Sequence, residues 1–256
     1  MKYWRVAVIA LVVLILWSLV GLVDSMGTTV YRLSNAIDYL SASWPPKIEI
    51  LPSIMYLLVE TFQMGLLGVT LGGLVAAPLS FLAARETTPH VLVSTLARGF
   101  INGCRSMPTL LWAILFVTMV GLGPVAGVFA LAVHCVGTLG KYFTESIDVM
   151  YPRSKEIMGA MEVDGAGRIR TLYHGLLPAL APLFLSHFIY YFEWSVRVGT
   201  ILGLVGAGGL GLRLTMTIRM FRRQETAAIV LMILVVVTII DGFSRLVRKR
   251  VLEAMA

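Results

Sequence analysis

The chain has 256 residues, of which 58% are hydrophobic and only 14% charged, and its formal net charge is +7. Soluble domains carry about 25% charged residues, so the composition excludes an ordinary soluble domain and predicts a protein that faces lipid. The positive charge does not indicate nucleic-acid binding, because the basic residues cluster at the ends of apolar runs, as expected for orientation in a membrane.

The first predicted membrane span is Val6–Val23, an uncharged run that follows two basic residues. A cleaved signal peptide also has a basic start and an apolar run. This run is long for a signal peptide, and no A-x-A cleavage site follows it, which favours a retained span. The region 24–53 is then external, with a short interfacial helix over 28–40 and a helix break at Pro45-Pro46.

Five further apolar runs bring the number of predicted spans to six and place both termini on the same side of the membrane. They cover residues 54–82, 108–122, 125–143, 179–203 and 226–244. With the termini in the cytoplasm, fourteen of the 21 lysines and arginines lie on the cytoplasmic side, as the positive-inside rule requires. The external loop 204–225 is the exception, because it contains Arg213, Arg219, Arg222 and Arg223.

The glycine-rich run Gly206–Gly211 satisfies G-x-G-x-x-G, but it follows a membrane span and has no surrounding βαβ unit. It therefore predicts a tight backbone break instead of a dinucleotide site. No G-x-x-x-x-G-K-[ST] loop occurs, so ATP hydrolysis is not expected in this chain. The histidines are scattered, and Cys104 and Cys135 are too few for a disulfide framework, so no metal site or catalytic centre is predicted.

Charged side chains inside a membrane are costly and commonly face a partner or a watery path. Glu193 and Arg197 fall within the span 179–203, and their i, i+4 spacing puts them on one face of a helix. Two interpretations stay open: a self-neutralising pair, or a polar lining of a substrate path in which Arg197 meets an anion. Glu60, near the start of the second span, is a further path candidate.

The longest polar segment between spans is Glu156–Pro178, which predicts a cytoplasmic elbow that another protein grips. Within it, Gly165 is followed after nine residues by Gly175-Leu176-Leu177-Pro178, which resembles the cytoplasmic coupling motif of ABC-importer permeases. Gly159 and Gly175 stand where that motif has Glu and Ile. The stretches Gly121–Val128, Thr138–Glu145, Tyr191–Arg197 and Val205–Gly209 resemble the phosphonate-type branch of that family.

The resemblance implies an all-α membrane protein of about six transmembrane helices with the type I importer permease fold. Residues 1–53 would form an N-terminal span plus an external segment, and residues 54–256 the permease core, with the coupling loop near 141–178. The residues expected to contact the ATPase are Glu156, Glu162, Asp164, Gly165, Ala166, Leu177 and Pro178.

The same resemblance implies the partners. They are a second permease copy in a homodimer, two ATPase subunits that bind ATP and Mg, and a periplasmic or lipid-anchored solute-binding protein. The chain would lie in a bacterial inner membrane, with lipid around it and no role for nucleic acid. The four arginines of the 204–225 loop would dock the solute-binding protein or attract an anionic substrate, with contact to anionic lipid as the alternative.

The predicted function is a transport subunit, not an enzyme: the permease of an ATP-driven importer for phosphonate or a related phosphorus oxyanion. A permease for methionine or another small solute is the alternative within the family. A secondary transporter would commonly show inverted repeats, and none is apparent. A membrane-embedded enzyme would need clustered catalytic groups, and the acids and histidines here are dispersed.

Overall fold

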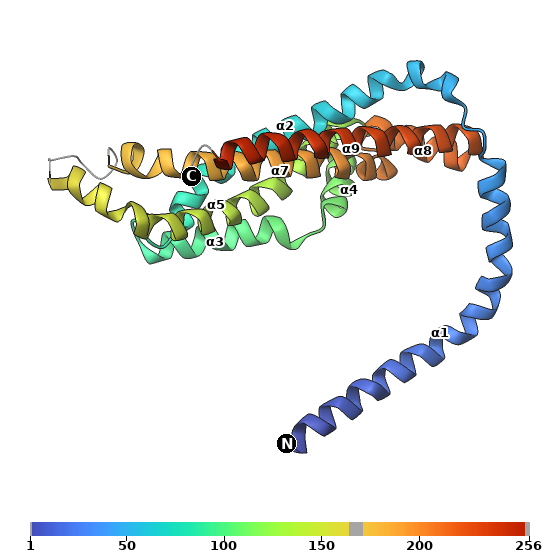
Figure 1. The fold of residues 1–256 in the computed structure, drawn as a ribbon, viewed down its shortest axis with the longest axis horizontal. Coiled ribbons are helices and arrows are strands. Elements are labelled where there is room, and N and C mark those ends of the chain that lie inside the picture. Colours follow the sequence, from blue (N-terminus) through green and yellow to red (C-terminus); the bar gives the residue numbers. More distant parts are fainter. Residues whose placement is uncertain (1, 164–170, 254–256) are drawn as a thin grey trace.

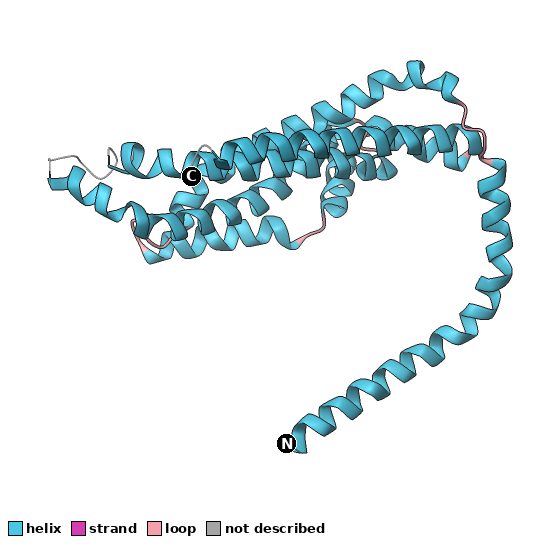
Figure 2. Cartoon of the chain, in the orientation of Figure 1, coloured by secondary structure: helices cyan, strands magenta, loops and turns pink. Residues whose placement is uncertain are grey.

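The computed structural model describes residues 2–163 and 171–253, and within these ranges every regular element is a helix (Figures 1 and 2). The elements in chain order are α1 (Lys2–Ala42), η1 (Ile48–Ile50), α2 (Leu51–Ala83), α3 (Val91–Ser106), α4 (Thr109–Val120), α5 (Pro124–Val163), η2 (Leu172–Leu176), α7 (Leu177–Leu202), η3 (Gly203–Val205), α8 (Gly209–Arg219) and α9 (Arg223–Glu253). The predicted all-helical class is confirmed.

Apolar helices of membrane-crossing length account for most of the predicted spans. Among the described residues, four such segments cover Ile48–Ala83, Pro124–Pro152, His174–Val205 and Arg223–Arg250. Helices α3 and α4 pass the same test only as a pair, bent by 86° at a short break. The first predicted span corresponds to a shorter apolar stretch, Val6–Gly21, within α1. The predicted span 108–122 corresponds to α4 alone, and α3 lies in what was predicted to be the loop 83–107.

Helix α2 lies at the centre of the bundle and packs mainly against α5, with α7 as its second neighbour. Small residues permit this approach: a Cβ added at Gly68 would contact Leu131, and one at Gly72 would collide with Cys135. Lipid is as apolar as a leucine side chain, so close packing of this kind, rather than the hydrophobic effect, holds membrane helices together. The α2–α5 contact therefore depends on these glycines.

Aromatic side chains join α5 to α7 along much of their shared length. Phe143 stacks on Phe184 with ring centroids 4.0 Å apart, and His134 stacks on Trp194 at 4.7 Å. Between them, Tyr142 and Tyr191 are in contact at 5.8 Å. Aromatic pairs in these geometries contribute about 0.5–1.5 kcal/mol beyond the area they bury. Helices α5 and α7 therefore form one packed unit.

Three helices extend beyond the segments that hydropathy marks. Helix α1 continues to Ala42 instead of ending at Val23, α3 occupies most of the predicted loop 83–107, and α5 continues to Val163 instead of ending at 143. Hydropathy records where apolar side chains end, whereas a helix ends where its backbone hydrogen bonds end. Even Pro152 lies inside α5. The predicted loop 141–178 is therefore largely helical.

The two ends of the bundle differ. The last turns of α5 and the start of α7 lie together at one end, while α1 joins the bundle at the opposite end and projects away from it (Figure 1). The C-terminal part of α1 meets α9, where the Arg223 guanidinium lies 5.2 Å from the ring centroid of Tyr39. The elbow predicted to couple to an ATPase and the region predicted to be external are thus at opposite ends, as the expected topology requires.

Candidate functional site

Helix α7 brings Glu193 and Arg197 into direct contact. The Arg197 Nη2 atom lies 2.6 Å from Glu193 Oε1, so the predicted i, i+4 pair forms a charge-assisted hydrogen bond. The two side chains have different surroundings: that of Glu193 is 7% exposed and that of Arg197 is 49% exposed. The buried carboxylate therefore anchors a guanidinium whose remaining donors reach out of the helix bundle, where they can meet an anion.

The neighbourhood of this pair contains a histidine, one of whose ring nitrogens is buried without a hydrogen-bond partner. His134 of α5 stacks on Trp194, the residue after Glu193, and its Nδ1 atom is buried with no partner among the described residues. His187 has a different setting, because its Nε2 atom lies 3.3 Å from Ser146 Oγ, which joins α7 to α5. The ring of His134 is therefore held by stacking on Trp194, whereas the ring of His187 is held by a hydrogen bond between α5 and α7.

Glu60 holds the start of α8. Its Oε1 atom accepts a hydrogen bond from the Gly209 backbone N–H at 3.0 Å, and the neighbouring Thr61 hydroxyl oxygen accepts one from the Leu210 N–H at 2.9 Å. Gly206, Gly208 and Gly209 have φ values of +89°, +82° and +68°, which favour glycine. The glycine-rich run is thus a tight break before α8, as predicted. The Glu60 carboxylate of α2 lies at the N-terminus of α8, which is the positive end of the helix dipole.

The residues predicted to couple to an ATPase are only partly visible. Glu156 and Glu162 lie on the last turns of α5, but their side chains are outside the description, and Asp164, Gly165 and Ala166 lie outside the described residues. Leu177 and Pro178 are the first two residues of α7, directly after the π-helical turn η2. Pro178 therefore stands at a helix start, where its missing N–H leaves no hydrogen bond unmade.

The four arginines of the 204–225 region do not form a single cluster. Arg213 and Arg222 both approach Glu225, at 3.5 and 3.4 Å, and Arg223 lies over the ring of Tyr39. Arg219 is exposed in the last turn of α8. Glu225 thus neutralises part of the positive charge. Arg219 and Arg222 are the exposed members of the group.

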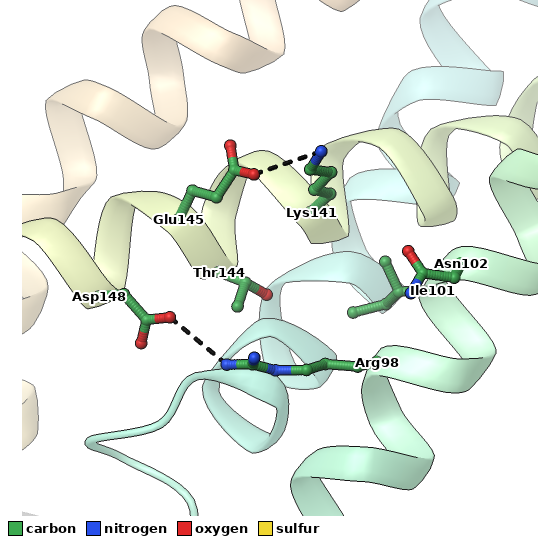
Figure 3. A pocket seen from close by; sticks show the side chains of 7 residues that line it. All are labelled: Arg98, Ile101, Asn102, Lys141, Thr144, Glu145 and Asp148. Carbon is green, nitrogen blue, oxygen red and sulfur yellow. Dashed lines mark hydrogen bonds and ion pairs between the residues drawn. The ribbon is translucent and has the colours of Figure 1, made fainter. Parts of the chain in front are cut away.

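A charged pocket that was not predicted from the sequence lies between α3 and α5 (Figure 3). It has a volume of about 170 Å³ and is lined by Arg98, Ile101, Asn102, Lys141, Thr144, Glu145 and Asp148. Two ion pairs face it: Arg98 Nη2 to Asp148 Oδ2, and Lys141 Nζ to Glu145 Oε1, each at 3.4 Å. The polar residues of α5 that line it are three or four positions apart, a spacing that predicts one polar helix face. Nothing in the sequence indicates that α3 lies opposite this face.

Metal chemistry finds no support in the described part of the chain, where no group of three or more His, Cys, Asp or Glu side chains could hold a metal ion. Both cysteines are free and buried. The arrangement offers ion pairs, a helix cap and a charged pocket, which suit binding and passage of a charged solute.

Comparison with known proteins agrees with these features. The family described as "Binding-protein-dependent transport system inner membrane component" matches residues 76–253. The phosphite transport system permease protein PtxC of Stutzerimonas stutzeri is 37% identical over 251 residues, which cover 96% of this chain and 90% of that protein. The phosphate-import permease protein PhnE of Mycolicibacterium smegmatis is also 37% identical, over 86% of this chain but only 41% of its own length.

A solved structure shares the fold. The structure described as inward-facing conformations of the MetNI methionine ABC transporter superposes with a TM-score of 0.64, covering 77% of this chain and 95% of that chain. The identity is 19%, so the likeness concerns the fold alone. The type I importer permease fold expected from the sequence is confirmed.

Proposed function

This chain belongs to the family of binding-protein-dependent transport system inner membrane components, and from that premise we propose that it is the permease of an importer for phosphonate, phosphite or a related phosphorus oxyanion. The observation that carries the proposal is the 37% identity to a phosphite permease along nearly the whole length of both chains.

Members of this family work in the inner membrane with ATPase and binding-protein partners. The finer assembly is part of the proposal: two identical permeases, two ATPase subunits that hold ATP and Mg, and both termini in the cytoplasm. The elbow between α5 and α7 would then face the ATPase, and α8 with the start of α9 would face outward. The proposed division into residues 1–53 and a core from 54 to 256 is supported by α1, which meets α9 near its C-terminal end. Helix α2 of the core begins slightly before that boundary, at Leu51.

Within the path, Arg197 is assigned to the substrate. One of its N–H groups donates to the buried Glu193 carboxylate, and the other N–H groups take no part in that hydrogen bond. Guanidinium groups bind phosphorus oxyanions well, because the geometries of their donors and acceptors match. Glu193 positions it. Glu60 acts on the path indirectly, because its carboxylate is engaged with the Gly209 N–H and fixes the outer helix α8.

Outside the membrane, Arg219 and Arg222 are assigned to docking of the solute-binding protein or to attraction of the anionic substrate, with Arg213 and Arg223 in supporting contacts. Salt would weaken either effect, since exposed charges are screened beyond about 8 Å at physiological ionic strength. The same residues would touch lipid headgroups if α8 lies in the interface.

Uptake by cells tests the substrate. Cells lacking this chain are supplied with labelled phosphonate, phosphate or methionine, with and without the chain restored. Restored uptake of phosphonate, and not of methionine, is the expected result. Restored uptake of methionine alone would keep the permease but overturn the substrate.

The coupling assignment has its own test, Gly165→Arg. A large charged side chain at the centre of the elbow is expected to abolish uptake, to below about 1% of wild type, because a loss of about 3 kcal/mol of contact energy lowers an equilibrium by more than a hundredfold. The protein should remain in the membrane at its normal amount. Normal uptake by a well-expressed variant would remove the elbow from the coupling mechanism.

A further inference from the structure

The pocket between α3 and α5 combines fixed and adjustable charges (Figure 3). Arg98 is fixed, because its Nε donates to the Ala83 carbonyl at 2.8 Å, and Asp148 is fixed, because its Oδ1 accepts from the Arg85 backbone N–H at 2.9 Å. Lys141 and Glu145 are more exposed, 43% and 56%, and touch each other only within one turn of α5. Both pairs are long for ion pairs, so a ligand could replace their contacts with better ones.

The charges of the pocket balance, and this balance selects its ligand. A plain oxyanion would gain Arg98 and Lys141 but would add negative charge beside Glu145 and Asp148, and like charges at such distances repel. A molecule with an oxyanion at one end and an ammonium at the other leaves the total unchanged. Thr144 and Asn102 add neutral polar groups to the same wall.

We infer that this pocket is a binding subsite for a small zwitterion, with the oxyanion between Arg98 and Lys141 and the ammonium between Glu145 and Asp148. The volume of about 170 Å³ suits a molecule of a few heavy atoms. Two kinds of solute share this chemistry: aminoalkylphosphonates and amino acids. The inference rests on the proposed function, because it takes the pocket to be part of a transport path.

The position of the pocket makes it the inner of two stations. Arg197 lies near the end of α7 that leads to η3 and α8, whereas Lys141 to Asp148 lie at the middle of α5. This part of α5 is nearer the elbow than Arg197 is, because Ser146 contacts His187, whereas Cys135 contacts Ser195. On the proposed topology, a solute would pass Arg197 first and this pocket second.

Glu145→Gln tests the proposed ammonium contact, because it removes one negative charge and leaves the other residues of the pocket unchanged. In the assembled transporter with its partners, uptake is measured with 2-aminoethylphosphonate and with ethylphosphonate, which lacks only the ammonium. The KM for 2-aminoethylphosphonate is expected to rise about tenfold, the effect of losing a hydrogen bond to a charged group, while the KM for ethylphosphonate stays within about twofold. Lys141→Gln should raise both KM values. Methionine, added as competitor, identifies an amino acid source if its inhibition also weakens in Glu145→Gln.

Asp241→Asn is the matched control, because Asp241 makes the same kind of i, i+4 pair with Arg245, at 3.1 Å, on α9. It should change neither KM. Equal changes for both phosphonates in Glu145→Gln, or no change for either, would overturn the zwitterion subsite and leave the proposed function intact. Failure of the wild-type transporter to take up either phosphonate or phosphite would overturn both.

Discussion

Two ion pairs in the molecule are built in opposite ways. Glu193 and Arg197 lie one turn apart on α7, at 2.6 Å, with the carboxylate buried and the guanidinium half exposed. Arg98 and Asp148 come from different helices, at 3.4 Å, and both are partly exposed, 34% and 31%. The first pair is a tight local unit that presents one group. The second is a longer, more exposed contact between helices, and each of its members is also held by a backbone group.

The difference decides how each pair responds to change. A buried charge left without its partner is strongly destabilising, because nothing replaces its lost hydration. Charges that water reaches lose much less, because solvent screens them. Replacement of one partner should therefore affect α7 more than the α3–α5 contact, and this ordering can be tested.

The largest effect is expected for Arg197→Ala. It leaves the Glu193 carboxylate buried and unpaired, at a cost of about 3–5 kcal/mol, and it removes the group assigned to the substrate. The amount of protein in the membrane and anion uptake should both fall, by immunoblot and by labelled uptake.

A double variant, Glu193→Gln with Arg197→Gln, separates the two consequences. It contains no unpaired charge, so the amount of protein should return to normal, while uptake should remain low because no guanidinium meets the anion. Recovery of uptake together with the protein would reduce the pair to a structural device.

An intermediate effect is expected for Asp148→Ala. The change removes the acceptor of the Arg85 N–H and of the Arg98 guanidinium, so the α2–α3 turn loses these polar contacts with α5, while the packing of Ala84 against Ile147 remains. Loss of such contacts costs about 1–3 kcal/mol, which should lower the temperature at which the purified protein aggregates. A decrease larger than that of Arg197→Ala would contradict the comparison.

The smallest effect is expected for a cross-link between α5, which contains Asp148, and α7, which contains Glu193 and Arg197. Cys135 Sγ of α5 lies 3.7 Å from Ser195 Oγ of α7, so Ser195→Cys can form a disulfide under oxidation. If the aromatic contacts make α5 and α7 one unit, uptake in oxidised and reduced vesicles should agree within about twofold, since packed helices move together. Loss of uptake on oxidation, restored by reductant, would show that the helices slide during transport.

The tight pair could be predicted from the sequence, because i, i+4 spacing is a local property of any helix. Four of the six predicted spans correspond to described helices of crossing length, for a similar reason, since hydropathy needs only neighbouring residues. The α3–α5 pocket could not be predicted, because Arg98 and Asp148 are far apart in the chain and meet only through helix packing.

The helix ends and the cap of α8 were hidden in the same way. Glu60 was recognised as a charge near the membrane, but its contact with Gly209 depends on how α2 and α8 lie in space. The polar composition beyond residue 143 predicts a loop, although the backbone of α5 continues as a helix to Val163. The sequence pattern shows which interactions a residue is able to make, whereas helix packing determines the partner with which it makes them.

The central claim, an ATP-driven importer for a phosphorus oxyanion, is tested most directly in vesicles that contain the assembled transporter with its solute-binding protein outside. Labelled ethylphosphonate is added outside, with ATP and Mg either present or absent inside, and with or without an ion gradient. The account predicts accumulation that needs internal ATP and persists without any ion gradient. Accumulation that follows an ion gradient without ATP, or ATP-dependent accumulation of methionine with none of ethylphosphonate, would contradict it.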